Sequence, residues 1–235
     1  MFRAVLFDFN GVLLDDEPVH FELFRKVLRE EGLDLLEETY WSDYLGFDDR
    51  GCFQAVFAAA GRPLDDAKTA RLVVRKASYY GAWIRENGYP FFPGAIELIH
   101  SVAASGALLG VVSGALREEV DGALRQAGVR DHFKLLVTAD DVVASKPDPE
   151  SYRRGLELLN SAPPLPERLI HPHEVLVLED SPAGLESALS VGLQTLAIGQ
   201  TYGAERLAKA QAFTAKVEDL TWDRILALMT ASSDG

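Results

Sequence analysis

Short apolar runs recur along this chain, and their spacing constrains the fold more than any other feature. They are FRAVLFD at residues 2–8, ALLGVVS at 107–113, KLLVT at 134–138, EVLVLED at 174–180 and QTLAIG at 194–199. Because nearly every position in them is apolar, they suit strands that are buried on both faces. The helical segments between them favour a parallel sheet. We therefore expect an α/β fold with a Rossmann-like parallel sheet as its core.

One long segment interrupts this alternation. Residues 16–87 contain no convincing strand, and an apolar helical stripe begins there with Phe21 and Phe24. Further apolar segments with helical periodicity follow. We expect a core domain of residues 1–15 and 88–235, with residues 16–87 inserted after the first strand as a helical cap domain.

Composition narrows the range of partners. The 235 residues carry a formal charge of −13, which repels nucleic acid and anionic membranes but leaves room for a small phosphorylated ligand at a locally positive site. A single cysteine, Cys52, excludes an intramolecular disulfide and fits a reducing compartment; a buried structural role is its simplest reading. No leader or membrane span is apparent. We expect a cytoplasmic monomer or weak homodimer.

Polar residues lie at the ends of four of these runs or in the loop after them. They are Asp8, Ser113 with Gly114, Lys146, and Glu179 with Asp180. The carboxyl ends of parallel strands meet at one edge, where open α/β sheets bind ligands. Taken singly, each residue has an ordinary explanation as a helix cap, turn or loop residue. The prediction of a site therefore depends on their combination.

The combination has complementary chemistry. Asp8, Glu179 and Asp180 offer oxygen ligands for Mg²⁺, which also takes phosphate oxygens. The hydroxyl of Ser113 and the backbone N–H after it can donate hydrogen bonds to a phosphate. Lys146 would offset the repulsion between carboxylates and phosphate. The pattern indicates a site for a phosphorylated small molecule.

Longer motifs carry a family resemblance. They are FDFNGVLLDDEPVH at 7–20, VVSGA at 111–115, SKPDPESY at 145–152 and VLEDSPAGLESA at 177–188. Together and in this order, they resemble the haloacid dehalogenase superfamily, in its branch of phosphoglycolate phosphatases and β-phosphoglucomutase-like proteins. The resemblance covers essentially the whole chain and implies the α/β core with an inserted helical cap.

The resemblance also implies roles for individual residues. Asp8 would attack phosphorus to form an aspartyl phosphate. Mg²⁺ would be held by Asp8, the backbone carbonyl of Asn10, Asp180, and Glu179 directly or through water. The phosphoryl group would be bound by Ser113 and Lys146, with the N–H of Gly114 beside them. The cap would close over the small phosphorylated metabolite and supply specificity.

Asn10 departs from the family pattern. Phosphatases and mutases of the superfamily have aspartate at this catalytic position, where it protonates the leaving group and then activates water. Dehalogenases also change this position, but they need no Mg²⁺, so the pair Glu179–Asp180 argues against that branch. We expect a Mg²⁺-dependent phosphate-monoester hydrolase whose activity Asn10 reduces. The alternatives are a β-phosphoglucomutase-like phosphotransferase and a non-catalytic phosphate-ligand-binding protein.

Four basic or titratable residues of the predicted cap are candidate substrate contacts: His20, Arg50, Arg75 and Lys76. The ordinary alternative for the charged ones is a solvated helix face. The register of Arg50 does not match the cap arginine of β-phosphoglucomutase-like proteins cleanly. The Lys-Asn pair expected after the second motif is also missing from SGALRE, which weakens the mutase assignment.

Overall fold

The chain divides into two compact units. The computed structural model describes residues 2–231. The core unit comprises Met1–Asp15 and Pro90–Gly235, and the helical unit comprises Asp16–Tyr89. The action of the helical unit as a cap stays a prediction. Among the described residues, no helix is long and apolar enough to cross a membrane.

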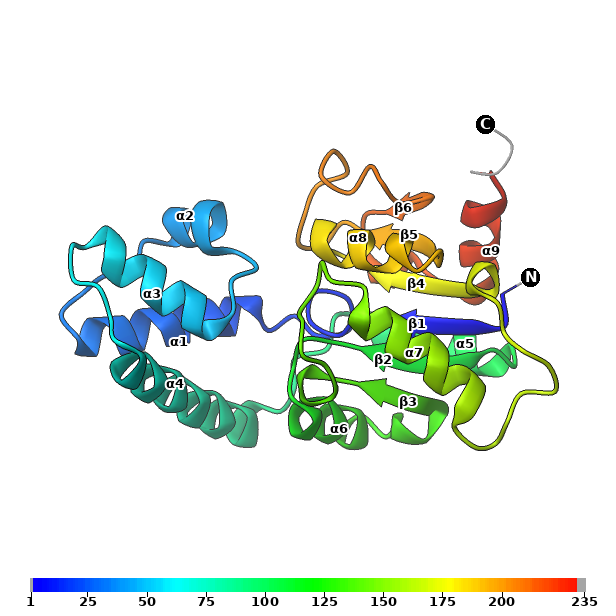
Figure 1. Cartoon of the computed structure of the whole chain (residues 1–235), viewed down its shortest axis with the longest axis horizontal. Coiled ribbons are helices and arrows are strands. Elements are labelled where there is room, and N and C mark those ends of the chain that lie inside the picture. The colour runs from blue at the N-terminus through cyan, green and yellow to red at the C-terminus, as the bar shows by residue number, and fades with distance from the viewer. Residues whose placement is uncertain (1, 232–235) are drawn as a thin grey trace. The chain divides into compact units, whose positions relative to one another are not determined.

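The core unit is built on one parallel sheet of six strands (Figure 1). The strands are β1 Ala4–Phe7, β2 Leu108–Val112, β3 Phe133–Val137, β4 Val175–Glu179, β5 Gln194–Ile198 and β6 Ala212–Thr214. Their order is β3-β2-β1-β4-β5-β6, and every neighbouring pair is parallel. The predicted Rossmann-like sheet is confirmed. The sequence analysis missed β6, because a three-residue edge strand is too short to show periodicity.

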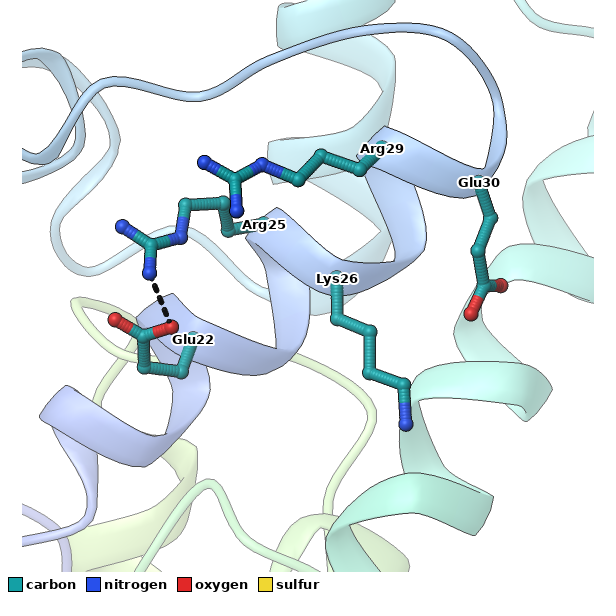
Figure 2. Close-up of a pocket in the computed structure, with 5 residues that line it drawn as sticks. All are labelled: Glu22, Arg25, Lys26, Arg29 and Glu30. Carbon is teal, nitrogen blue, oxygen red and sulfur yellow. Dashed lines mark hydrogen bonds and ion pairs between the residues drawn. The ribbon is translucent and has the colours of Figure 1, made fainter.

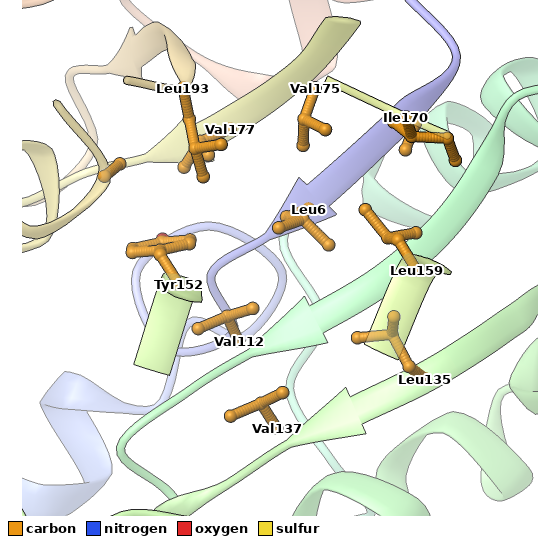
Figure 3. Close-up of a cluster of buried hydrophobic side chains, with 12 residues drawn as sticks. Leu6, Val112, Leu135, Val137, Tyr152, Leu159, Ile170, Val175, Val177 and Leu193 are labelled. Carbon is orange, nitrogen blue, oxygen red and sulfur yellow. The ribbon is translucent and has the colours of Figure 1, made fainter. Parts of the chain in front are cut away.

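Helices cover the sheet. In the core unit they are α5 Ala95–Ala104, α6 Arg117–Gln126, α7 Glu150–Ser161, α8 Pro182–Ser190 and α9 Trp222–Ala231. Short 3-10 turns occupy Arg130–His132, Ala139–Asp141, Pro172–Glu174 and Val217–Asp219. Figure 3 shows Leu6, Val112 and Val137 of the sheet packed in one cluster with Tyr152 and Leu159 of α7.

Strands β1 to β5 are buried on both faces. Leu6 belongs to the cluster under α7, whereas its neighbours Val5 and Phe7 are fully buried outside it. Successive side chains of a strand point to opposite faces. Phe7 contacts the ring of Phe133 at 5.8 Å between centroids. Burial of both faces explains why the strands read as continuous apolar runs.

The register of the sheet sets the position of the site. Phe7 lies beside Val111 of β2 and Leu178 of β4. The backbone N–H of Asp8 then donates to the carbonyl of Leu178 at 2.9 Å. The loops that follow β1, β2 and β4 therefore leave the sheet side by side at one edge, as expected for this topology.

The helical unit has a separate apolar core. Its elements are α1 Glu17–Glu30, α2 Glu37–Thr39, a π-helix at Tyr40–Tyr44, α3 Asp49–Ala59 and α4 Asp66–Asn87. The side chains of Asp48 and Asp65 accept from backbone N–H groups and cap α3 and α4. Phe24 and Phe53 pack edge to face at 5.1 Å between centroids. Cys52 is buried there, and burial raises the pKa of its thiol to about 12, so it has the expected structural role.

An ion pair between Arg168 and Glu174 lies in the connection that precedes β4. It predicts that the stability of the protein falls at acid pH. Arg168 donates to both carboxylate oxygens of Glu174, at 2.6 and 3.0 Å, and the backbone N–H of His171 adds a third hydrogen bond at 3.0 Å. The pKa of Glu174 is lowered from 4.5 to about 2. The hydrogen bonds from the Arg168 side chain are the largest cause, and the hydrogen bond from the His171 N–H is the second. A carboxyl group whose pKa is lower in the folded than in the unfolded protein stabilises the fold at pH values above its unfolded pKa. This stabilisation is lost as the pH falls through its folded pKa.

We therefore expect Glu174→Gln to be less stable than the natural protein at pH 7, and the difference to shrink between pH 4.5 and about 2. Urea unfolding midpoints of both proteins across this range measure the effect. A difference that stays constant with pH would contradict the assignment.

Candidate active site

A buried lysine joins two carboxylates at the carboxyl edge of the sheet. The Nζ of Lys146 donates to Oδ1 of Asp8 at 2.8 Å, to Oε1 of Glu179 at 2.6 Å and to the carbonyl of Val112 at 3.1 Å. The pKa of Lys146 is raised because these two carboxylates outweigh the effect of burial. The structure thus brings together three residues that lie far apart in the sequence.

Glu179 is held by a full set of donors. The hydroxyl of Tyr152 donates to Oε1 at 2.9 Å. The other oxygen accepts from the backbone N–H groups of Asp180 and Ser181 and from the Ser181 hydroxyl, each at 3.1 Å. Glu179 has no exposed surface. Tyr152 was not predicted as a site residue, because its contact depends on how α7 packs on the sheet.

Three buried carboxylates face one another. Asp8, Glu179 and Asp180 each offer an oxygen, and these atoms all lie within 4.8 Å of one another. Burial raises the pKa of Asp8 to about 6, with Lys146 opposing and Glu179 adding to the shift. Burial, Glu179 and Asp8 raise the pKa of Asp180.

One lysine cannot balance this charge, so the cluster favours a bound cation. The donor set is made only of oxygens, which is the chemistry that Mg²⁺ prefers. The residues present therefore fit a magnesium ion.

Two glycines permit this arrangement. A Cβ on Gly11, whose φ is +78°, would lie 1.9 Å from Oδ2 of Asp180. A Cβ on Gly184 would lie 1.8 Å from Oε1 of Glu179. Any larger residue would displace a carboxylate. Both glycines lie inside the quoted motifs, but only the close approach in the structure shows why they are needed.

Ser113 and Asn10 lie beside the carboxylates. The Oγ of Ser113 is 3.5 Å from Oδ1 of Asn10 and accepts from the backbone N–H of Ala115 at 3.0 Å. Ser113 is buried at the end of β2. A Cβ on Gly114 would meet no atom within 4 Å, so space remains beside this loop. Phosphate binding by Ser113 and Gly114 stays a prediction.

The residues predicted in the helical unit separate into two groups. Lys76 is 1% exposed and bonds to Nδ1 of His20 at 2.8 Å and to Oδ1 of Asp49 at 2.5 Å. It therefore does not lie on a solvated helix face. Arg50 pairs at the surface with Asp66 at 3.0 Å.

Arg75 likewise pairs with Glu30 and Glu31, each at 3.1 Å. Arg50 and Arg75 thus form surface ion pairs, as expected of residues on a solvated helix face.

Figure 2 shows a hollow on the surface of α1. None of the residues that line it was predicted as a site residue. It is lined by Glu22, Arg25, Lys26, Arg29 and Glu30. Arg25 pairs with Glu22 at 2.7 Å, and the ammonium of Lys26 lies 3.6 Å from the ring centre of Tyr79. Exposed pairs of this kind contribute little binding energy, and we assign no chemistry to the hollow.

Fold and site together define a class of protein: a Rossmann-like α/β protein with buried carboxylates and a lysine at the carboxyl edge of its sheet. Residues 5–198 match the haloacid dehalogenase-like hydrolase family. The chain belongs to this family, in the branch of phosphoglycolate phosphatases and β-phosphoglucomutase-like proteins.

Two curated relatives of the chain are phosphatases by name. Validoxylamine A 7'-phosphate phosphatase of Streptomyces hygroscopicus subsp. limoneus is 28% identical over 229 residues, covering 96% of this chain and 99% of the relative. The phosphorylated carbohydrates phosphatase of Thermotoga maritima is 30% identical and covers 83% of each chain.

Solved structures share the fold. β-Phosphoglucomutase from Clostridium difficile aligns with a TM-score of 0.81 over the whole of both chains at 21% identity, which shows the fold alone. CbbY from Rhodobacter sphaeroides was solved as an Asp-to-Asn mutant with xylulose-(1,5)bisphosphate. It aligns with a TM-score of 0.77 at 25% identity, covering 94% of this chain and 96% of that one.

Proposed function

We propose that this protein hydrolyses the phosphate monoester of a small sugar or related metabolite, with Asp8 as nucleophile and Mg²⁺ as cofactor. The observation that carries the proposal is the Lys146 bridge, which holds Asp8 and Glu179 together at 2.8 and 2.6 Å beside Asp180. The names of the curated relatives support a phosphorylated small molecule as substrate.

The proposed reaction assigns a role to each of these residues. Asp8 attacks phosphorus through a carboxylate oxygen and the bond from phosphorus to the ester oxygen breaks, so that the aspartyl phosphate forms and the leaving oxygen takes a proton from solvent water. Lys146 and Ser113 bind the phosphoryl oxygens and stabilise the charge that develops on them. Water then hydrolyses the aspartyl phosphate and releases inorganic phosphate.

The proposed metal ligands are Asp8, Asp180, Glu179 and the backbone carbonyl of Asn10. When bound, Mg²⁺ would neutralise charge on these carboxylates and on the phosphate.

Asn10 lowers the proposed activity. Its amide can neither donate nor accept a proton near neutral pH, whereas its backbone carbonyl remains able to bind a metal. Substrate binding would persist while general acid–base help at this position is lost. A β-phosphoglucomutase-like phosphotransferase is the second candidate, favoured by a 26% identical structure of that name from Thermotoga maritima with a TM-score of 0.70.

The test combines activity with binding. A screen of phosphate monoesters with Mg²⁺ is expected to find release of inorganic phosphate that EDTA abolishes. Mg²⁺ affinity measured by calorimetry is expected to fall at least about 10-fold in Asp180→Ala, and vanadate affinity by a similar factor in Lys146→Ala. Lys209→Ala, which removes only a surface pair with Glu186, is the control. Unchanged affinities in the site variants would refute the assignment.

A further inference from the structure

The hydroxyl of Tyr152 is a buried polar group to which the proposed chemistry gives no role. It donates to Oε1 of Glu179 at 2.9 Å, and it lies 3.4 Å from Nζ of Lys146, from which it can accept. The ammonium also lies 4.9 Å from the centre of the tyrosine ring. Tyr152 has no exposed surface. Its hydroxyl therefore contacts both members of the buried ion pair between Lys146 and Glu179.

The N–H groups of Lys146 already have close acceptors. A lysine ammonium carries three N–H groups. Their acceptors are Oε1 of Glu179 at 2.6 Å, Oδ1 of Asp8 at 2.8 Å and the carbonyl of Val112 at 3.1 Å. A phosphoryl oxygen must therefore compete with these groups for the ammonium. Glu179 is the strongest competitor, because it is charged and its oxygen is the closest of the three.

The donors around Glu179 determine how easily Lys146 can turn away from it. Oε2 accepts from the backbone and side chain of Ser181 and from the backbone of Asp180, each at 3.1 Å. Among the described residues, Oε1 accepts from Lys146 and Tyr152. While Tyr152 stays bonded to Oε1, a shift of Lys146 toward a phosphoryl oxygen leaves neither carboxylate oxygen without a donor. Without the tyrosine hydroxyl, the same shift would leave a buried acceptor unpaired, which is unfavourable.

We propose that Tyr152 is a positioning residue that frees Lys146 to bind the phosphoryl group, an inference that rests on the proposed hydrolysis. Its hydroxyl keeps Oε1 of Glu179 hydrogen-bonded as the ammonium moves toward the phosphoryl oxygens. The ring packs in the cluster under α7 with Leu6 and Val112, which holds the hydroxyl in place. A phenylalanine would fill the same space, but Lys146 would then be the one donor to Oε1 among the described residues and would be tied to Glu179.

The test removes the hydroxyl and keeps the ring. In Tyr152→Phe, the affinity for vanadate in the presence of Mg²⁺ is expected to fall at least about 5-fold, measured by calorimetry. The affinity for Mg²⁺ alone is expected to change by less than about 3-fold, because Glu179 keeps Lys146 and the donors to Oε2. Tyr79→Phe is the matched control, since it removes a hydroxyl that donates to exposed Glu30 at 2.8 Å, and it should change neither affinity. Thermal unfolding and circular dichroism establish that each variant is folded.

A double-mutant cycle separates positioning from structure. In a Lys146→Ala background no ammonium remains to be freed, so Tyr152→Phe is expected to change vanadate affinity by less than about 2-fold. An equal loss in both backgrounds, or a loss of Mg²⁺ affinity as large as that of vanadate affinity, would show a merely structural role and overturn the proposal. Unchanged vanadate affinity in Tyr152→Phe would also overturn it. If Lys146→Ala itself leaves vanadate affinity unchanged, the phosphate site of the proposed hydrolase is refuted instead.

Discussion

Asp8→Asn is expected to lower the turnover of every phosphate monoester by at least about 10⁴-fold, the largest effect of any single substitution in this chain. The amide is a poor nucleophile, so no aspartyl phosphate can form. Lys146 would keep Glu179 as a partner at 2.6 Å, so the site loses its nucleophile without leaving a buried ammonium unpaired. Rapid-quench measurement of ³²P bound covalently to protein, alongside steady-state phosphate release, tests both consequences.

The substitution Glu186→Gln is the matched control, since it changes a surface carboxylate that pairs only with Lys209 among the contacts described for it. It should leave both readouts unchanged. Covalent labelling that persists in Asp8→Asn would assign the nucleophile to another residue. Turnover within about 10-fold of the natural chain would refute covalent catalysis by Asp8 altogether.

Asn10→Asp is expected to raise kcat for a natural phosphate monoester by at least about 10², within the range that a placed acid–base group contributes. The new carboxylate can protonate the leaving alcohol and then deprotonate the attacking water. It also brings negative charge close to the phosphate, so ground-state binding is expected to weaken or stay the same. The gain should be smallest for 4-nitrophenyl phosphate, whose leaving group needs little protonation.

Deamidation is the specific confounder of this experiment. Asn10 precedes Gly11, and glycine hinders succinimide formation least, so an aged sample can contain molecules with aspartate at position 10. Mass spectrometry of the peptide that contains residue 10 quantifies that fraction. The activity of the deamidated molecules can then be separated from the activity of the natural chain. If Asn10→Asp does not raise kcat above that of a natural sample free of deamidation, another group already supplies the general acid–base catalysis.

The sequence was sufficient for five of the six strands and for most of the groups at the carboxyl edge of the sheet. Strands buried on both faces must be apolar at almost every position, so β1 to β5 are legible as short runs without any tertiary information. The right-handed, parallel connections that such runs require bring their carboxyl ends to one edge. Residues that directly follow the runs, such as Asp8 and Asp180, could therefore be assigned to one place before their contacts were known.

Only the tertiary structure decided which of these groups touch. The bridge from Lys146 to Asp8 spans 138 residues, and the support of Glu179 by Tyr152 depends on α7 lying against the sheet. Local sequence is also a poor guide at Asp16. An aspartate at this position is suited to cap α1, but its side chain contacts His20 and Tyr80 instead. Periodicity reports which face of an element is buried. The partner of a polar side chain is set by packing between segments distant in the chain, because a buried carboxylate must find donors wherever the fold supplies them.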